Sequence, residues 1–226
     1  MCGRFTLKTP PDQWGKLLLP LLDIEAAKAK WMPRYNVAPT QNIVAIAVDC
    51  ESAERFTDYF RWGLIPSWSE DLSIGNRMIN ARAETLGEKR SFAGPLKSRR
   101  CVVIADGYYE WKTEGKLKQP YWIHPTAGGV FAMAGLWETN RRATGQPLKS
   151  CTIITTSANE KLAEVHDRMP VVLVDEALRS WLSPNLSADE TPRLLETVSE
   201  DFFQTQAVDR RVNNARIDDK DCLRPV

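Results

Sequence analysis

The sequence has little of what metal sites and disulfide frameworks are built from. Its 226 residues include only two histidines and five widely spaced cysteines, which are Cys2, Cys50, Cys101, Cys151 and Cys222. No two cysteines form a CxxC pair, and no histidine cluster accompanies them. This spacing argues against a zinc site and against a disulfide framework, and it fits a reducing compartment. We expect no metal and no cofactor.

The chain also lacks a dominant charge and a long apolar run. Thirty Lys and Arg residues balance 29 Asp and Glu residues, for a formal net charge of +1. Any polyanion site must therefore be a local cluster of basic residues. The N-terminus does not have the basic and apolar regions of a secretory signal, and the apolar stretches are too short to cross a bilayer. We expect a cytoplasmic protein without membrane contact.

What is present suffices for a core, because 43% of the residues are hydrophobic and 26% are charged, as is typical of soluble proteins. The length fits one domain spanning residues 1–226, and no repeat or low-complexity segment divides it. The polar stretch 139–147 is flanked closely by strand-like segments. We interpret it as a hairpin loop and not as a domain boundary.

Short β-branched and apolar runs predict most of the secondary structure as strands. These runs cover residues 43–48, 56–62, 101–105, 121–124, 130–136 and 151–156. Helices are predicted over residues 17–30 (interrupted by Pro20), 158–165, 175–182 and 191–199. Many short strands without βαβ alternation favour an α+β fold, with a central twisted, barrel-like, mainly antiparallel sheet and several peripheral helices.

Cys2 is the residue with the most distinctive chemistry. If an aminopeptidase removes Met1, Cys2 carries a thiol and a free α-amine, which titrate at about 8.5 and about 7.7–8.0. Such a residue can capture an aldehyde as an imine through nitrogen and close it through sulfur into a thiazolidine ring. A cysteine at position two also fits chance, and it fits an N-terminal-nucleophile hydrolase.

Four polar clusters interrupt the apolar segments, at residues 34–39, 78–85, 105–111 and 165–170. Glu110 lies between Tyr109 and Trp111. It is either a carboxylate with a raised pKa or, by strand alternation, one that faces solvent. His166 is either a proton shuttle or a cap at a helix end. We interpret the second histidine, His124, as structural.

Arginines and tryptophans occur in or beside these clusters. Arginine suits phosphate because its planar guanidinium forms bidentate hydrogen bonds, and aromatic faces stack on bases. A single-stranded nucleic-acid site is one interpretation, and solvated arginines with core tryptophans are the other. We assign Trp137 to the core. The residues concerned are Arg4, Arg77, Arg82, Arg168, Arg211, Arg216, Trp62, Trp68 and Trp111.

Taken in order, these segments resemble the SRAP family of SOS-response-associated peptidases, also described as abasic-site processing proteins. The resemblance runs along nearly the whole chain. It is carried by Met1–Phe5, the motif 34–39, Trp62–Trp68, 80–85, 106–111, Ala134–Trp137, 166–170 and Val212–Asn214. Two positions depart from the family pattern: Ile104 replaces a frequent proline, and Ser69 replaces a second tryptophan of some members.

The resemblance implies a function in DNA repair under the SOS response. Cys2, freed of Met1 by a peptidase-type reaction, would form a thiazolidine crosslink with an abasic site in single-stranded DNA. Glu110 would act as acid and base in the lyase-like imine chemistry, His166 would assist proton transfer, and Asn80 would orient the N-terminus or the sugar. DNA contacts are implied for Arg4, Asn36, Pro39, Trp68, Arg82 and Arg168.

The same resemblance implies a monomer that is associated with the nucleoid when bound to DNA. A glutamine amidotransferase-like or autoprocessing hydrolase stays open as the alternative, because such enzymes also expose Cys2 after losing Met1. However, the chain lacks the Arg-Gly-Pro-Asp-like segment that is usual in glutaminase domains.

Overall fold

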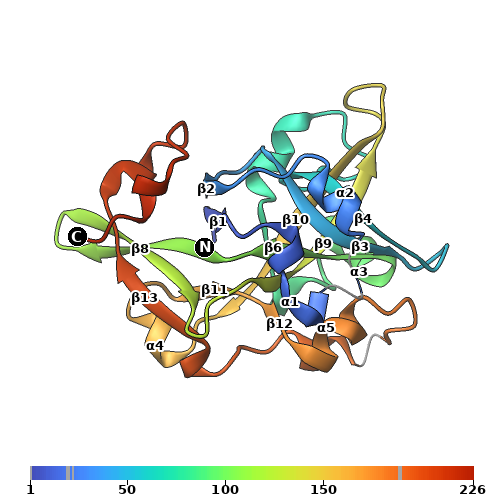
Figure 1. The fold of residues 1–226 in the computed structure, drawn as a ribbon. Helices are drawn as coiled ribbons and strands as arrows, with labels where there is room; N and C mark the ends of the chain where they lie inside the picture. The colour runs from blue at the N-terminus through green and yellow to red at the C-terminus, as the bar shows by residue number, and fades with distance from the viewer. Residues whose placement is uncertain (1, 19–20, 22, 188–189) are drawn as a thin grey trace.

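The computed structural model describes residues 2–18, 21, 23–187 and 190–226. Its described strands form two sheets (Figure 1). The 5-stranded sheet has the order β13-β8-β7-β1-β2. Its members are β1 (Phe5–Leu7), β2 (Arg34–Val37), β7 (Gly107–Glu114), β8 (Leu117–Pro125) and β13 (Phe203–Ala207).

The second sheet is 8-stranded and closes on itself. Strand β3 pairs antiparallel with β4 and β6, β6 pairs with β9, and β9 pairs with β10. Strand β10 then returns to β4 in parallel, which completes a ring of hydrogen-bonded strands. This arrangement confirms the predicted α+β fold with a barrel-like, mainly antiparallel sheet. The strands are β3 (Asn42–Asp49), β4 (Glu54–Trp62), β5 (Asn80–Arg82), β6 (Arg99–Ala105), β9 (Phe131–Asn140), β10 (Leu148–Ser157), β11 (Arg168–Pro170) and β12 (Val172–Leu173).

The ring is packed so tightly that one position admits only glycine. A Cβ on Gly135, in β9, would lie 2.7 Å from the carbonyl oxygen of Thr152 and 3.0 Å from Sγ of Cys101. Trp137, two residues on, is buried as predicted and donates its indole N–H to the carbonyl of Val48. The 139–147 stretch joins β9 to β10, which are paired from Leu148↔Asn140 onward, so the hairpin prediction is confirmed.

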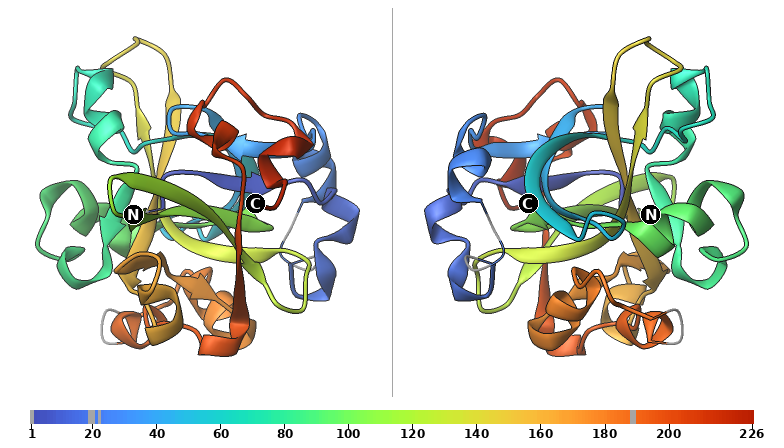
Figure 2. Two further views of the ribbon diagram at one scale, coloured as in Figure 1. Left: turned by 90° about the vertical axis from the view of Figure 1, so that its left-hand side faces the viewer. Right: turned by 90° about the vertical axis from the view of Figure 1, so that its right-hand side faces the viewer.

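The helices are short and lie around the outside of the two sheets (Figure 2). They are α1 (Gly15–Leu18), α2 (Ile24–Lys28), α3 (Arg90–Ser98), α4 (Glu160–Ala163), α5 (Asp175–Trp181) and α6 (Thr191–Leu194). None of the helices within the described ranges has the length and apolarity to cross a bilayer.

The 175–182 prediction corresponds to α5 within one residue, and the other three predicted helices are clearly longer than the observed ones. The 17–30 prediction overlaps the last two residues of α1 and contains α2, and the expected break at Pro20 lies outside the described residues. The 158–165 prediction shortens to α4, because the backbone N–H of Ala158 donates to Asp167 and the Asn159 side chain caps the first turn. The 191–199 prediction shortens to α6, since Thr197, Val198 and Ser199 are weak helix formers.

The chain after β13 folds back on the 5-stranded sheet and lies beside β8 and β2 (Figure 1). Asp218 accepts hydrogen bonds from the backbone N–H groups of Tyr35 and Asn36, at 2.6 and 2.8 Å, and pairs with the Arg34 guanidinium. Two short 3-10 turns in this C-terminal segment, Arg210–Asn213 and Lys220–Leu223, bury Val212 and Cys222. The two ends of the chain are thereby held together.

Candidate functional site

The N-terminal strand is fixed to β7 by a buried aspartate. Asp106 accepts hydrogen bonds from the hydroxyl of Thr6 (2.6 Å) and from the backbone N–H groups of Lys8 (2.7 Å) and Thr9 (2.8 Å). The next residue must be glycine, because a Cβ on Gly107 would lie 2.0 Å from Nε1 of Trp122. Asp106 and Gly107, in the polar cluster at residues 105–111, therefore hold the N-terminal strand in place.

Strand register then places the first residues beside Glu110. Phe5 pairs with Tyr108, and the backbone N–H of Tyr109 donates to the carbonyl of Arg4 at 3.0 Å. Antiparallel pairing continued by this bond brings the residues before Arg4 alongside Glu110.

Asn80 reaches the same place from β5, where it is positioned by pairing with Ile153 of β10. Its side-chain Nδ2 donates to the carbonyl oxygen of Cys2 at 2.7 Å. Cys2 itself is completely buried in the chain that begins with Met1. The structure thus brings the second polar cluster into contact with the N-terminus.

Glu110 is 2% exposed, which excludes the alternative that it faces solvent. Alternation along β7 does turn it away from Tyr109 and Trp111. The face it shares with Tyr108, however, is directed into the protein, and Tyr108 is completely buried. His166, in the turn between α4 and β11, places Nε2 at 3.9 Å from Oε2 of Glu110. We call Cys2, Asn80, Glu110 and His166 the N-terminal site.

Burial sets the charges in the N-terminal site. Desolvation, with a smaller effect of Asp167, raises the pKa of Glu110 to about 7. Desolvation likewise lowers the pKa of His166, so its imidazole is neutral near pH 7. Burial first and Glu110 second raise the pKa of the Cys2 thiol well above its ordinary value. Cys2 therefore holds a thiol and not a thiolate.

The hydrogen bonds of His166 indicate which ring nitrogen carries the proton. Nδ1 accepts the backbone N–H of Arg168 at 3.0 Å, and it also lies 2.8 Å from Oδ1 of Asp167. One nitrogen cannot accept the first bond and donate the second. The Asp167 side chain is 86% exposed and is solvated by water, so we favour the backbone bond. The proton then sits on Nε2, which faces Glu110.

Two of the predicted DNA contacts, Arg4 and Asn36, bind the C-terminal segment. The Arg4 guanidinium is half-buried and donates to Oδ1 of Asn36 (2.9 Å) and to the carbonyl of Val212 (2.6 Å). Asn36 is completely buried, and its Nδ2 donates to the carbonyls of Val212, Asn214 and Ile217. Asn36 therefore positions Arg4, and the polar atoms of its own side chain are bonded within the protein.

Arg168 is engaged by a carboxylate. Its Nη1 and Nη2 donate to the two oxygens of Glu84 at 2.6 and 2.9 Å, and Nη2 also donates to the carbonyl of Thr155. Arg82, at the end of β5, is exposed. Arg82 pairs with Thr155 of β10, two residues from Ser157, which pairs with Arg168.

Trp68 is the exposed member of the tryptophans considered for stacking. Its side chain is 40% exposed, and the guanidinium of Arg90 lies 5.3 Å from a ring centroid. Trp62 is completely buried, so the stacking role considered for it was wrong. Pro39 is half-buried at the end of β2.

The sequence reasoning missed Asn140, which holds the Trp68 loop. This completely buried side chain donates to the carbonyls of Pro66 (2.6 Å) and Ser69 (2.8 Å). Its Oδ1 accepts from the backbone of Arg142 and Ala143. An asparagine at the junction of a predicted strand and a hairpin loop was the available signal.

Arg211 and His124 have partners of their own and do not add to the N-terminal site. Arg211 pairs with Asp209, Asp219 and Asp221, and His124 stacks on Trp122 with ring centroids 3.8 Å apart. Within the described ranges no three His, Cys, Asp or Glu side chains are grouped so that they could hold a metal ion.

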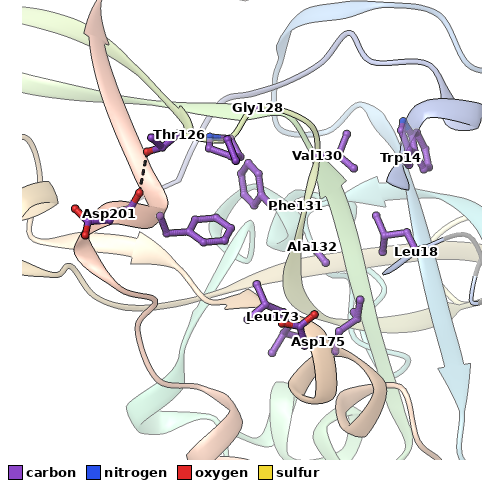
Figure 3. A pocket seen from close by; sticks show the side chains of 15 residues that line it. Trp14, Leu18, Thr126, Gly128, Val130, Phe131, Ala132, Leu173, Asp175 and Asp201 are labelled. Carbon is purple, nitrogen blue, oxygen red and sulfur yellow. Dashed lines mark hydrogen bonds between the residues drawn. The ribbon is translucent and has the colours of Figure 1, made fainter. Parts of the chain in front are cut away.

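A pocket of about 530 Å³ lies elsewhere, between Trp14, the β8–β9 turn and α5 (Figure 3). Its lining is mainly apolar and includes Leu18, Phe131 and Leu173. None of the N-terminal site residues lines it. The N-terminal site, where a thiol, a carboxyl group and an imidazole lie together, is therefore the candidate for chemistry.

Comparison with known proteins decides the family. The family model described as SOS response associated peptidase (SRAP) matches residues 1–215. The chain belongs to the SRAP family. SRAP relatives include the abasic site processing protein YoqW of Bacillus subtilis (strain 168), 43% identical, with 96% of each chain covered. Another is the abasic site processing protein YedK of Escherichia coli (strain K12), 30% identical, with 100% of each chain covered.

A solved structure shares this SRAP fold. An X-ray structure of a protein from Bacteroides thetaiotaomicron superposes with a TM-score of 0.85 at 26% sequence identity, covering 100% of both chains. The likeness therefore extends over the N-terminal site and the C-terminal segment alike.

Proposed function

We propose that this SRAP chain processes abasic sites in single-stranded DNA, by crosslinking them covalently to Cys2 after Met1 has been removed. The observation that carries the proposal is the convergence of Asn80, Glu110 and His166 on the N-terminus, from three separate parts of the chain. The names of the SRAP relatives support the substrate, since several are called abasic site processing proteins.

The chemistry follows from the charges. The α-amine nitrogen of Cys2 attacks the C1′ aldehyde carbon of the ring-opened sugar, and the carbonyl electrons move to oxygen. With a pKa of about 7, Glu110 is partly protonated. One proton from the amine and one from Glu110 convert that oxygen into water, which leaves, and the Glu110 carboxylate then takes the remaining proton from nitrogen to give an imine. The thiol then adds across the C=N bond, sulfur to carbon and proton to nitrogen. The net reaction is aldehyde plus Cys2 giving thiazolidine plus water.

The imidazole of His166 relays protons. It takes up a proton from solvent, and the resulting imidazolium passes the proton on Nε2, which faces Glu110, to that carboxylate. Asn80 holds the Cys2 carbonyl while the amine reacts. Arg4, Arg82 and Arg168 would bind phosphates, and Trp68 and Pro39 would contact bases or sugar. We further propose that the protein acts as a monomer in the cytoplasm, at the nucleoid.

The test uses a single-stranded oligonucleotide containing one uracil, with and without uracil-DNA glycosylase. A heat-stable band shift should appear only with glycosylase, and Cys2→Ala should abolish it. Cys50→Ala is the matched control, because Cys50 is a free, half-buried cysteine. A shift that persists in Cys2→Ala would overturn the mechanism.

Intact-mass spectrometry adds a second readout. The proposal requires a mass lower by one methionine, because a retained Met1 blocks the α-amine. The competing N-terminal-nucleophile hydrolase would instead release ammonia from glutamine.

A further inference from the structure

Tyr108 lies beside the N-terminal site and has no role in the mechanism above. It precedes Glu110 by two residues on β7, so the two side chains share one face of the strand. Tyr108 is completely buried in the same apolar cluster as Cys2 and Phe5. Its ring packs edge-on against Phe203, with centroids 5.6 Å apart.

The hydroxyl of Tyr108 is buried and, among the residues that the structure describes, has no hydrogen-bond partner. Other tyrosine hydroxyls are satisfied: Tyr109 donates to the carbonyl of Tyr35 and Tyr59 to that of Ala27, each at 2.7 Å. A buried hydroxyl without a partner destabilises the fold, and phenylalanine would fill the same space without that penalty. The hydroxyl therefore requires an explanation other than packing.

Within the described ranges, one atom of the N-terminal site itself is also buried without a hydrogen-bond partner. The side-chain Oδ1 of Asn80 is buried without a partner in the described parts of the chain, although its Nδ2 is bonded to Cys2. The Tyr108 hydroxyl is thus an unused donor and Oδ1 of Asn80 an unused acceptor. A polar ligand with oxygen atoms, such as a sugar, would supply partners for both.

The hydroxyl is a donor and not a base. Burial, followed by the effects of Cys2 and Glu110, raises the pKa of Tyr108 well above its ordinary value. The group thus remains protonated throughout the range in which proteins work.

We propose that the Tyr108 hydroxyl donates a hydrogen bond to the sugar oxygen on the carbon that Cys2 attacks. This role rests on the proposed function. As the amine adds, the carbonyl electrons move onto that oxygen, and a donor already in place stabilises the developing charge. Tyr108 transfers no proton, because Glu110 supplies the proton with which the oxygen leaves as water.

Tyr108→Phe tests the role, since it removes only the hydroxyl and keeps the ring. Single-turnover crosslinking to abasic single-stranded DNA should slow by roughly ten- to a hundredfold at saturating DNA. DNA affinity, measured in a Cys2→Ala background, should change by less than about twofold. The melting temperature should stay equal or rise, because an unpaired buried hydroxyl is lost. Tyr59→Phe, on the far strand β4, is the control and should crosslink at the wild-type rate.

The outcomes separate the two proposals. A wild-type protein that forms no crosslink refutes the proposed function and the role of Tyr108 with it. A wild-type protein that crosslinks while Tyr108→Phe matches its rate refutes the role of Tyr108 alone. A slower Tyr108→Phe with a lowered melting temperature assigns the hydroxyl to folding, and this also overturns the proposal.

Discussion

At the scale of single residues, the N-terminal site depends on placing a carboxylate where water cannot reach it. Glu110 is 2% exposed, and burial brings its pKa to about 7. A carboxyl group at its ordinary pKa would be fully ionised at neutral pH and could not donate a proton. The same burial keeps His166 neutral and Cys2 protonated, so one physical cause sets three protonation states.

Glu110→Gln should stabilise the protein at alkaline pH relative to acid pH. The pKa in the folded protein is about 7, above the ordinary value of 4.5, so folding favours the protonated form. Glu110 therefore costs no stability below about pH 4.5. Its cost grows as pH rises from about 4.5 to 7 and levels off above 7, at roughly 3 kcal/mol. Urea unfolding of both proteins at pH 4.5 and pH 8 measures the difference. A pH-independent difference would contradict the raised pKa.

The crosslinking rate should follow the same group. For the wild-type protein we expect the rate to fall as pH rises above about 7, because Glu110 loses the proton that it donates. In Glu110→Gln this decline should vanish, at a lower overall rate. A decline that survives in the variant would assign the titration to another group.

Glu84→Gln should strengthen binding to single-stranded DNA. The substitution removes the charge that neutralises Arg168, whose side chain is only 12% exposed. We expect about two- to fivefold tighter binding at low salt and a steeper salt dependence, because the Arg168 guanidinium becomes available to a phosphate. Fluorescence anisotropy in a Cys2→Ala background measures it, with the exposed Glu88→Gln as control. Weaker binding would mean that Glu84 serves to hold Arg168 in position.

At the scale of elements, the loop that carries Trp68 is tied to rigid strands. The Trp68 loop is anchored to β9 through Asn140 and to β10 through Ser150, whose hydroxyl accepts the backbone N–H of Ile65 at 2.8 Å. A second tie is the contact between Gly63 and Gly75, where a Cβ on Gly63 would lie 2.5 Å from the Gly75 carbonyl oxygen. Trp68 is thus presented on a fixed loop, although it lies outside regular structure.

Asn140→Ala should loosen the Trp68 loop. It leaves the carbonyls of Pro66 and Ser69 without their donor, which costs about 1–3 kcal/mol of folding free energy. We expect a lower melting temperature and weaker binding of single-stranded DNA. Thermal melts and anisotropy measure the two effects, and the exposed Asn185→Ala is the control. Unchanged DNA binding alongside a lower melting temperature would exclude the loop from the interface.

Prediction from sequence succeeded where apolar and β-branched residues run together and failed where residue types are mixed. The run at residues 43–48 became β3, and all six of its residues are buried. Strand β7 was missed because its sequence mixes glycine, aromatic and charged residues, although Gly107 to Glu110 are all buried. Asn80 was found by resemblance only, since its three-residue strand has no pattern of its own and depends on pairing with β10.

At the scale of the whole molecule, the C-terminal segment completes the support of the N-terminus. Its carbonyls at Val212, Asn214 and Ile217 accept from Asn36, and Arg4 donates to the first of them. Val212 and Cys222 add a small apolar cluster with Tyr109 and Trp122. Residues more than 200 positions apart in sequence therefore fix the strand that carries Cys2. That residues 1–226 form one domain remains a prediction.

Asp218→Ala should weaken this attachment. The backbone N–H groups of Tyr35 and Asn36 would lose their acceptor, and Arg34 would lose its partner. We expect a loss of about 2–4 kcal/mol in unfolding free energy and slower crosslinking as Arg4 becomes less well placed. Urea titration and the band-shift assay measure both, and the exposed Lys220→Ala is the control. Equal stability of the two variants would contradict a supporting role for the segment.

The sequence by itself determined the strands of the ring and, through ordered motifs, the family. These features depend on residue type and local spacing, which a linear chain displays directly. Tertiary structure decided that Glu110 is buried and that the Asn36 side chain binds the C-terminal segment. It also decided that Arg82 is exposed and that Arg168 is paired with Glu84. Burial and pairing arise between segments far apart in the chain, so the pKa values and the geometry of the N-terminal site exist only in the folded protein.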